Sequence, residues 1–130
     1  MKILVGYDGS TQAKEALNIA KKHAQAFHGA VYVVTSLEGE AHTSTEEVKK
    51  AQEDLEYAKE LLSEAGIQVE THLLIRGFTP GEDLVRFAAE HWIDEIVVGI
   101  RKTSPVGKML FGSNARHVIL NAPCPVVTVK

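Results

Sequence analysis

Short apolar runs alternate with amphipathic stretches along the whole chain, and this alternation predicts strands and helices in turn. Apolar residues recur at helical spacing in the first amphipathic stretch, at Ala13, Ala16, Leu17, Ala20, Ala24 and Phe27. The runs rich in Val, Ile and Leu have the length of buried strands and cover residues 2–7, 31–35, 67–75, 95–99 and 125–129. The pattern therefore predicts the order β-α-β-α-β-α-β-α-β.

Polar residues and glycines mark where the predicted helices begin and end. Ser10 is a candidate cap for the first helix, and Gly29 is expected to end it in the left-handed conformation. Ser44 and Glu47 form a capping box before a second helix that ends at Gly66, and residues 79–82 combine a capping box with proline at the first helical position. The apolar stripe expected to bury the third helix consists of Leu84, Val85, Phe87, Ala88 and Trp92.

Alternating strands and helices over the length of a single domain predict an α/β fold. We expect one doubly wound, mostly parallel five-stranded sheet with helices on both faces, and the 67–75 strand near an edge. Ligands of such folds bind at the carboxyl ends of the strands, where the strand order reverses. The turns after Tyr7 and after Gly99 both follow strands, so they line one crevice if the first and fourth strands are neighbours.

The last third of the chain has the parts of an anion-binding site. The apolar strand that ends in Gly99 is followed by a loop over residues 100–111, and Gly112-Ser113-Asn114 then opens a short helix that runs to about Leu120. Amides in the first turn of a helix have no intrahelical partner, and the helix dipole adds partial positive charge there. This combination indicates a phosphate site but does not establish one, because a helix start with Ser113 or Asn114 as its cap has the same sequence.

Composition narrows the class of protein. The chain has 130 residues, the length of a single domain. Its net charge of −3 provides no positive electrostatic field that would attract a nucleic acid. No apolar run is long enough to span a bilayer, and the single cysteine, Cys124, excludes an intramolecular disulfide and a cysteine zinc cluster. These features predict a cytoplasmic protein without membrane or nucleic-acid partners.

The chain resembles the universal stress protein family over essentially its whole length, residues 1–130, as a single domain, and three segments carry the resemblance. They are the opening residues 3–10, the fourth strand 96–99 and the closing residues 121–127. Nucleotide-binding members carry the pattern G-x2-G-x9-G-[ST]; Gly99 and Gly112-Ser113 match it, and Lys102 stands in place of the middle glycine. The resemblance implies a Rossmann-like, adenine nucleotide alpha hydrolase-like fold and a protein of stress response or signalling.

The same resemblance implies how a bound ATP would lie, with Mg²⁺ or Mn²⁺ carried by its phosphates. Asp8 would face the ribose, the backbone around Ser36 would meet the adenine edge, and amides of the loop and of the last helix would hold the phosphates. The residues implied as binding are Gly6, Tyr7, Asp8, Ser36, Val98, Gly99, Arg101, Lys102, Gly112, Ser113 and Asn114. Lys102 either closes the backbone path that a glycine would leave open or places its ammonium on the phosphates, a role that Arg101 could share.

Other interpretations remain open at this point. Asp8 is also a good turn residue before a helix, and a family member without nucleotide binding would act as a dimeric interaction protein. A slow ATPase is a third possibility, although no general base is evident and no catalytic or metal-binding residue is predicted. The short terminal strand, Val126–Val129, predicts a homodimer of the kind that the resemblance implies, because pairing two such edges would cover their free backbone groups; the alternative is a monomer in which nearby side chains cover the edge.

Overall fold

The computed structural model describes residues 1–39, 43–100 and 112–130. Its helices and strands alternate in the order that the sequence predicts: β1 Lys2–Gly6, α1 Thr11–Phe27, β2 Ala30–Leu37, α2 Thr45–Glu64, β3 Val69–Ile75, α3 Pro80–Glu90, β4 Glu95–Gly99, α4 Ser113–Asn121 and β5 Val126–Val129. None of the described helices combines the length and the apolar character that crossing a membrane requires.

The five strands form one parallel sheet in the order β3-β2-β1-β4-β5. Strand β1 lies at the centre, where Leu4 is opposite Tyr32 of β2 and Ile96 of β4. The connections leave β1 toward β2 first and return to its other side with β4, so the strand order reverses between β1 and β4. The predicted neighbourhood of the first and fourth strands is confirmed, and β3 and β5 are the two edges.

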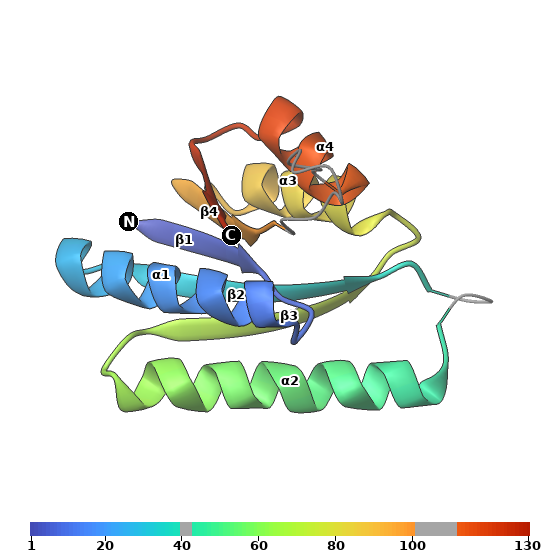
Figure 1. Cartoon of the computed structure of the whole chain (residues 1–130), viewed down its shortest axis with the longest axis horizontal. Helices are drawn as coiled ribbons and strands as arrows, with labels where there is room; N and C mark the ends of the chain where they lie inside the picture. The colour runs from blue at the N-terminus through green and yellow to red at the C-terminus, as the bar shows by residue number, and fades with distance from the viewer. Residues whose placement is uncertain (40–42, 101–111) are drawn as a thin grey trace.

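Two apolar cores hold the helices on the two faces of the sheet (Figure 1). Helices α1 and α2 cover one face, against side chains such as Ile3, Val5 and Val33. Helices α3 and α4 cover the other face, against Leu4, Val34 and their neighbours, with Phe87 of α3 fully buried among them. The alternation of side chains along each strand therefore feeds both cores, which explains why the central strands read as continuous apolar runs.

Several boundaries and side chains differ from the sequence-based prediction. Phe27 is the last residue of α1 and is 59% exposed, so the apolar stripe of this helix is buried only as far as Ala24. His28 rather than Gly29 takes the left-handed conformation after α1, with φ of 52°, and Gly29 is needed because a Cβ there would meet the Met1 carbonyl at 2.9 Å. Strand β2 runs on to Leu37, so Ser36 is a strand residue and not a loop residue. Trp92 lies beyond the end of α3 and is 82% exposed, because the helix stops at Glu90 before its apolar stripe reaches that position.

Candidate functional site

A crevice of about 320 Å³ opens at the carboxyl ends of β1, β2 and β4, where the strand order reverses. This volume is near the lower end of the range of about 300–1,000 Å³ for small-molecule sites. Its described lining comes from both faces of the sheet and consists of Gly6, Tyr7, Asp8, Ser10, Ala13, Val34, Thr35, Ser36, Leu37, Glu47, Lys50, Ala51, Asp54, Pro80, Leu84, Val98, Gly99, Asn114, Ala115 and Val118.

Most of the residues that the sequence singles out come together in this crevice. The lining includes Gly6, Tyr7, Asp8, Ser36, Val98, Gly99 and Asn114. Gly112 and Ser113 adjoin Asn114 in the chain at the start of α4, but they are not part of the lining. Arg101 and Lys102 lie outside the described residues. Segments that are far apart in sequence thus meet at one edge of the sheet, as the predicted topology requires.

The N-terminus of α4 is not capped by a described side chain. Gly112 is the N-cap residue, so the alternative in which Ser113 or Asn114 caps this helix is wrong. The first intrahelical bond runs from the Arg116 amide to the Gly112 carbonyl, at 3.0 Å, and the amides of residues 113–115 precede it. Among the described residues, a Cβ added to Gly112 would meet nothing within 4 Å. The geometry suits an anion that approaches these amides.

The N-terminus of α3, by contrast, is closed by the protein's own groups. The Thr79 hydroxyl accepts from the Glu82 amide at 3.4 Å and donates to the Glu82 carboxylate at 2.7 Å, which is the predicted capping box. The side-chain carbonyl of Asn114 accepts from the Gly81 amide at 2.9 Å. A Cβ on Gly81 would come within 2.8 Å of the Asn114 carbonyl oxygen, so the close approach of α3 and α4 requires a glycine here.

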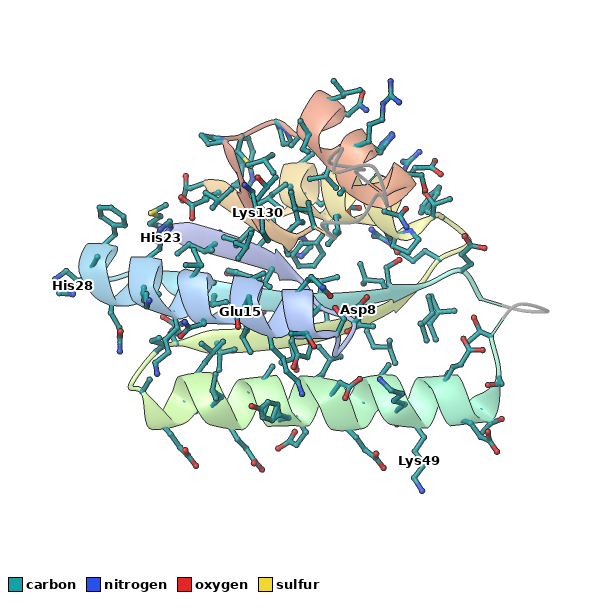
Figure 2. All side chains as sticks on the ribbon, viewed as in Figure 1. Asp8, Glu15, His23, His28, Lys49 and Lys130 are labelled. Atoms are coloured by element: carbon teal, nitrogen blue, oxygen red, sulfur yellow. The ribbon has the colours of Figure 1, made fainter. Side chains whose placement is uncertain are left out.

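Asp8 satisfies the turn interpretation and keeps an acceptor for a ligand. One oxygen, Oδ1, accepts from the Ser10 amide at 2.9 Å, and Ser10 in turn caps α1 by accepting from the Ala13 amide at 3.2 Å. The side chain is exposed, and it lies at the end of α1 opposite to the end that carries His28 (Figure 2). The second carboxylate oxygen can therefore accept from a polar group of a ligand while the turn stays intact.

The hydroxyl of Ser36 belongs to a buried polar chain. It donates to Oδ2 of Asp83 at 2.7 Å, and Oδ1 of the same carboxylate accepts from Nε of Arg76, also at 2.7 Å. Asp83 is completely buried, and Arg76 reaches out to Glu90 at 3.0 Å. Burial alone would lower the pKa of Arg76, but its hydrogen bonds to Asp83 and Glu90 outweigh burial and raise that pKa. A serine at the end of β2 thus has a structural reason, because it helps to satisfy a buried charge.

Helix α2 supplies a wall of the crevice that the sequence did not reveal. Lys50 pairs with Asp54 at 2.8 Å across one helical turn, and Glu47 lines the crevice one turn earlier. Asp54 also lies so close to Gly9 that a Cβ there would approach its carboxylate to 2.5 Å, and Gly9 has φ of 77°. The helical spacing of these charges predicts only a solvated face, since nothing local to α2 indicates that this face borders the ends of β1 and β2.

Tyr7 brings an unusual polar atom to the same edge. The residue is 3% exposed, and its hydroxyl is buried without a hydrogen-bond partner among the described residues. Burial, together with the nearby negative charges of Asp54 and Asp8, raises the pKa of this phenol to about 12. The main chain of Tyr7 is well held, because its carbonyl accepts from the Thr35 hydroxyl at 2.6 Å and its amide donates to the Val34 carbonyl at 2.8 Å.

Gly99 is required by packing as well as by its place after β4. A Cβ at this position would come within 2.5 Å of the Gln12 backbone, so only glycine lets β4 end against the first turn of α1.

Two other kinds of chemical group receive no support as functional sites. Burial raises the pKa of the Cys124 thiol, which favours its protonated, less reactive form. Within residues 1–39, 43–100 and 112–130, no three His, Cys, Asp or Glu side chains converge as a metal site.

Comparison with known proteins agrees with this geometry. The model of the universal stress protein family matches residues 1–130. A universal stress protein of Thermus aquaticus is 36% identical and is matched over 98% of this chain and 97% of its own length. Among solved structures, a universal stress protein from Archaeoglobus fulgidus is 41% identical with a TM-score of 0.90, covering 99% of this chain and 97% of that one. The chain belongs to the universal stress protein family, and its fold is that of adenine nucleotide alpha hydrolase-like proteins.

A second solved structure among those similar to this chain contains a nucleotide. It is that of the universal stress protein from Archaeoglobus fulgidus in complex with dAMP, which is 37% identical to this chain with a TM-score of 0.84. The match covers 99% of this chain and 96% of that one.

Proposed function

We propose that this universal stress protein binds an adenine nucleotide in the crevice at the β1–β4 switch point. The observation that carries the proposal is the meeting of this crevice with the N-terminus of α4, which no side chain of the described residues caps and whose amides can receive a phosphate group. The family relationship and the dAMP complex of a relative support it. We infer that binding serves stress response or signalling in the cytoplasm.

The distribution of charge favours one orientation of the nucleotide. Carboxylates of Asp8, Glu47 and Asp54 line the part of the crevice beside α2, and the one described cation of the lining, Lys50, is already paired with Asp54. A phosphate would be repelled there, whereas ribose hydroxyls could donate to Asp8. We therefore place the ribose near Asp8, the base toward the end of β2 and the phosphates toward α4.

The proposed ligand is ATP, with Mg²⁺ or Mn²⁺ carried by its phosphates. The residues present fit the group, because the amides of residues 113–115 can receive a phosphate and none of the described residues lies within 4 Å of a Cβ added at Gly112. Arg101 and Lys102 follow β4 in the chain, and we propose that their side chains neutralise the outer phosphates in place of the backbone contact that a glycine at 102 would give. Bound ATP would supply the negatively charged phosphate chain that these amides and side chains receive.

Calorimetric titration of nucleotide-stripped protein with ATP, ADP and AMP in the presence of Mg²⁺ tests this function. We expect saturable one-to-one binding at micromolar concentration, which corresponds to about −8 kcal/mol. Tighter binding of ATP than of AMP would support phosphate contacts by Arg101 and Lys102. Absence of heat and of any thermal shift at millimolar nucleotide would contradict the proposal and favour a dimeric interaction protein.

We also infer a homodimer that pairs β5 of two copies. Strand β5 is a sheet edge of four residues, three of them only half-buried, and an unpaired parallel edge of this kind exposes its backbone groups. A two-fold axis would bring the same edge of a second copy against it. Sedimentation equilibrium should report twice the mass of the chain, 14.2 kDa each. A monomer at all concentrations would contradict this arrangement.

A further inference from the structure

The hydroxyl of Ser36 has its proton committed to a buried carboxylate. A serine hydroxyl has one proton to donate and two lone pairs that accept. Here the proton lies on the hydrogen bond to Oδ2 of Asp83, at 2.7 Å. Asp83 cannot donate in return, because its other oxygen faces the permanently charged guanidinium of Arg76, with Nε at 2.7 Å and Nη2 at 2.6 Å. Toward any third group, the Ser36 hydroxyl is therefore only an acceptor.

The position of Ser36 makes this polarity available to a ligand. Ser36 is half-buried and lines the crevice near the end of β2, whereas Asp83 behind it is fully buried in the first turn of α3. The buried part of the chain is rigid, since Arg76 grips Asp83 with two nitrogens and Glu90 at 3.0 Å holds the guanidinium from outside. A ligand in the crevice thus meets a hydroxyl whose donor and acceptor roles are fixed before it arrives.

We infer that Ser36, oriented by Asp83, selects the base of the nucleotide by accepting a hydrogen bond from the 6-amino group of adenine. The inference rests on the proposed function, which places the base toward the end of β2. Adenine carries a donor at position 6, whereas guanine and hypoxanthine carry an acceptor oxygen there. A hydroxyl that can only accept forms a hydrogen bond with the amino group of adenine. With guanine or hypoxanthine it faces another acceptor, so no hydrogen bond forms and the site rejects these bases strongly.

Changing Asp83 to asparagine reverses the polarity of Ser36 without removing it. The carbonyl oxygen of the asparagine must face Arg76, because a guanidinium only donates, and so its amide nitrogen must face Ser36. That nitrogen donates to the Ser36 hydroxyl, whose own proton is then free for a 6-oxo group. Asp83 thus acts as a positioning residue, and its substitution predicts a change of base preference that loss of stability alone would not produce.

The experiment measures affinities for AMP, IMP and purine riboside 5′-monophosphate, which lacks the 6-substituent. We expect the wild-type chain to bind AMP at least tenfold more tightly than IMP, and about three- to tenfold more tightly than the unsubstituted purine, the effect of one neutral hydrogen bond. Ser36→Ala should bring the AMP and unsubstituted-purine affinities together, and Ser36→Thr should retain the preference. Asp83→Asn should lower the ratio of the affinity for AMP to the affinity for IMP by tenfold or more.

Two controls separate this effect from general loosening of the site. Glu90→Gln removes the charge of the outer partner of Arg76 but keeps an acceptor oxygen for the guanidinium and leaves the Asp83–Ser36 hydrogen bond, so it should keep the wild-type preference. Ser63→Ala changes an exposed serine of α2 outside the crevice lining and should change nothing. If Asp83→Asn does not fold, the comparison of Ser36→Ala with Ser36→Thr decides.

The inference is overturned if the wild-type chain binds AMP and a folded Asp83→Asn variant keeps the same AMP-to-IMP ratio. It is also overturned if Ser36→Ala still prefers AMP over the unsubstituted purine to the wild-type extent. Failure of the proposed function would look different, because the wild-type chain would then bind none of the three nucleotides.

Discussion

Helices α3 and α4 begin next to each other at the carboxyl edge of the sheet, and their N-termini are completed in different ways. At α3, Thr79 caps the first turn and Asn114 of the neighbouring helix takes the Gly81 amide. At α4, the N-cap is Gly112, and no described side chain accepts from the first-turn amides. Both N-termini carry partial positive charge and amides without an intrahelical partner, although Pro80 at the first position of α3 has no amide hydrogen.

The contrast separates two uses of one physical feature. A closed N-terminus contributes to the stability of the fold, because its donors are paired in every folded molecule. An open N-terminus gives up that contribution and leaves its donors for a ligand. We therefore expect substitutions at the start of α3 to change stability without changing affinity, and substitutions at the start of α4 to do the reverse.

The largest expected effect comes from closing α4 with a negative side chain. Gly112→Asp places a carboxylate where the phosphate is proposed to bind, and like charges about 4 Å apart repel by about 1–4 kcal/mol between water and a protein surface. AMP affinity should fall about 10- to 100-fold by calorimetry, while the free energy of unfolding rises by a few tenths of a kcal/mol. Gly112→Asn offers the same cap without the charge and should lose less affinity. Wild-type affinity in a folded Gly112→Asp variant would show that phosphate does not bind here.

Opening α3 should have the complementary effect. Thr79→Ala removes the side chain that accepts from the Glu82 amide, and loss of such a cap costs about 1 kcal/mol of unfolding free energy. Thr79 is not part of the crevice lining, so the AMP affinity should not change. Urea denaturation measures the first quantity and calorimetry the second, with Thr79→Ser as the matched variant that keeps the cap. A parallel loss of affinity would mean that the two N-termini are not independent.

A third polar group at the same edge, the Tyr7 hydroxyl, tests whether an unpaired donor weakens the fold. Tyr7→Phe removes a buried hydroxyl that has no partner among the described residues, so stability should stay the same or rise by up to about 1 kcal/mol. The folded pKa of Tyr7, about 12, is above the ordinary value of 10.0. The contribution of the protonated phenol to the free energy of unfolding is therefore fully present below pH 10 and is lost as the pH rises toward 12. Thermal unfolding between these values should show that loss in the wild type and a smaller loss in Tyr7→Phe; equal slopes would contradict it.

The smallest effect concerns the acidic half of the α3 capping box. The hydrogen bond from Thr79 lowers the pKa of Glu82 from its ordinary value of 4.5. A lowered folded pKa means that the contribution is present above pH 4.5 and disappears as the pH falls through the folded value. The difference in melting temperature between wild type and Glu82→Gln should therefore shrink on acidification. A difference that is constant with pH would assign the capping contribution to Thr79 alone.

Local patterns in the sequence predict much of this fold. The capping signals at Ser10, Ser44 and Thr79 give three helix starts, and the apolar runs give the strands within a few residues. Two errors have different causes. Gly29 is kept for its closeness to Met1 and not for its φ, a tertiary contact that the sequence does not show, whereas Trp92 is exposed because α3 ends before it.

The candidate site is predictable only where it follows the strand ends. Residues after β1 and β4 are found because parallel strands deliver their carboxyl ends to one edge. The α2 wall of the crevice is missed because Lys50 and Asp54 pair within one helix, and nothing in that helix indicates that it borders Gly9 after β1. The Asp83–Ser36 hydrogen bond is missed because it joins α3 to β2 across 47 positions in the chain. The sequence gives a weak indication of a buried role for Asp83, because this carboxylate lies on the apolar face of an amphipathic helix. No sequence motif marks the residue.

Backbone amide shifts during a titration with AMP test the comparison of the two helices most directly. Nitrogen-15 spectra of the wild-type chain report each amide separately, including those of Gly81 and of residues 113–115. The account predicts large, saturable shifts for residues 113–115 and little change for Gly81, whose amide stays on Asn114. Saturable binding that leaves residues 113–115 unshifted, or that shifts Gly81 as strongly as residues 113–115, would contradict it.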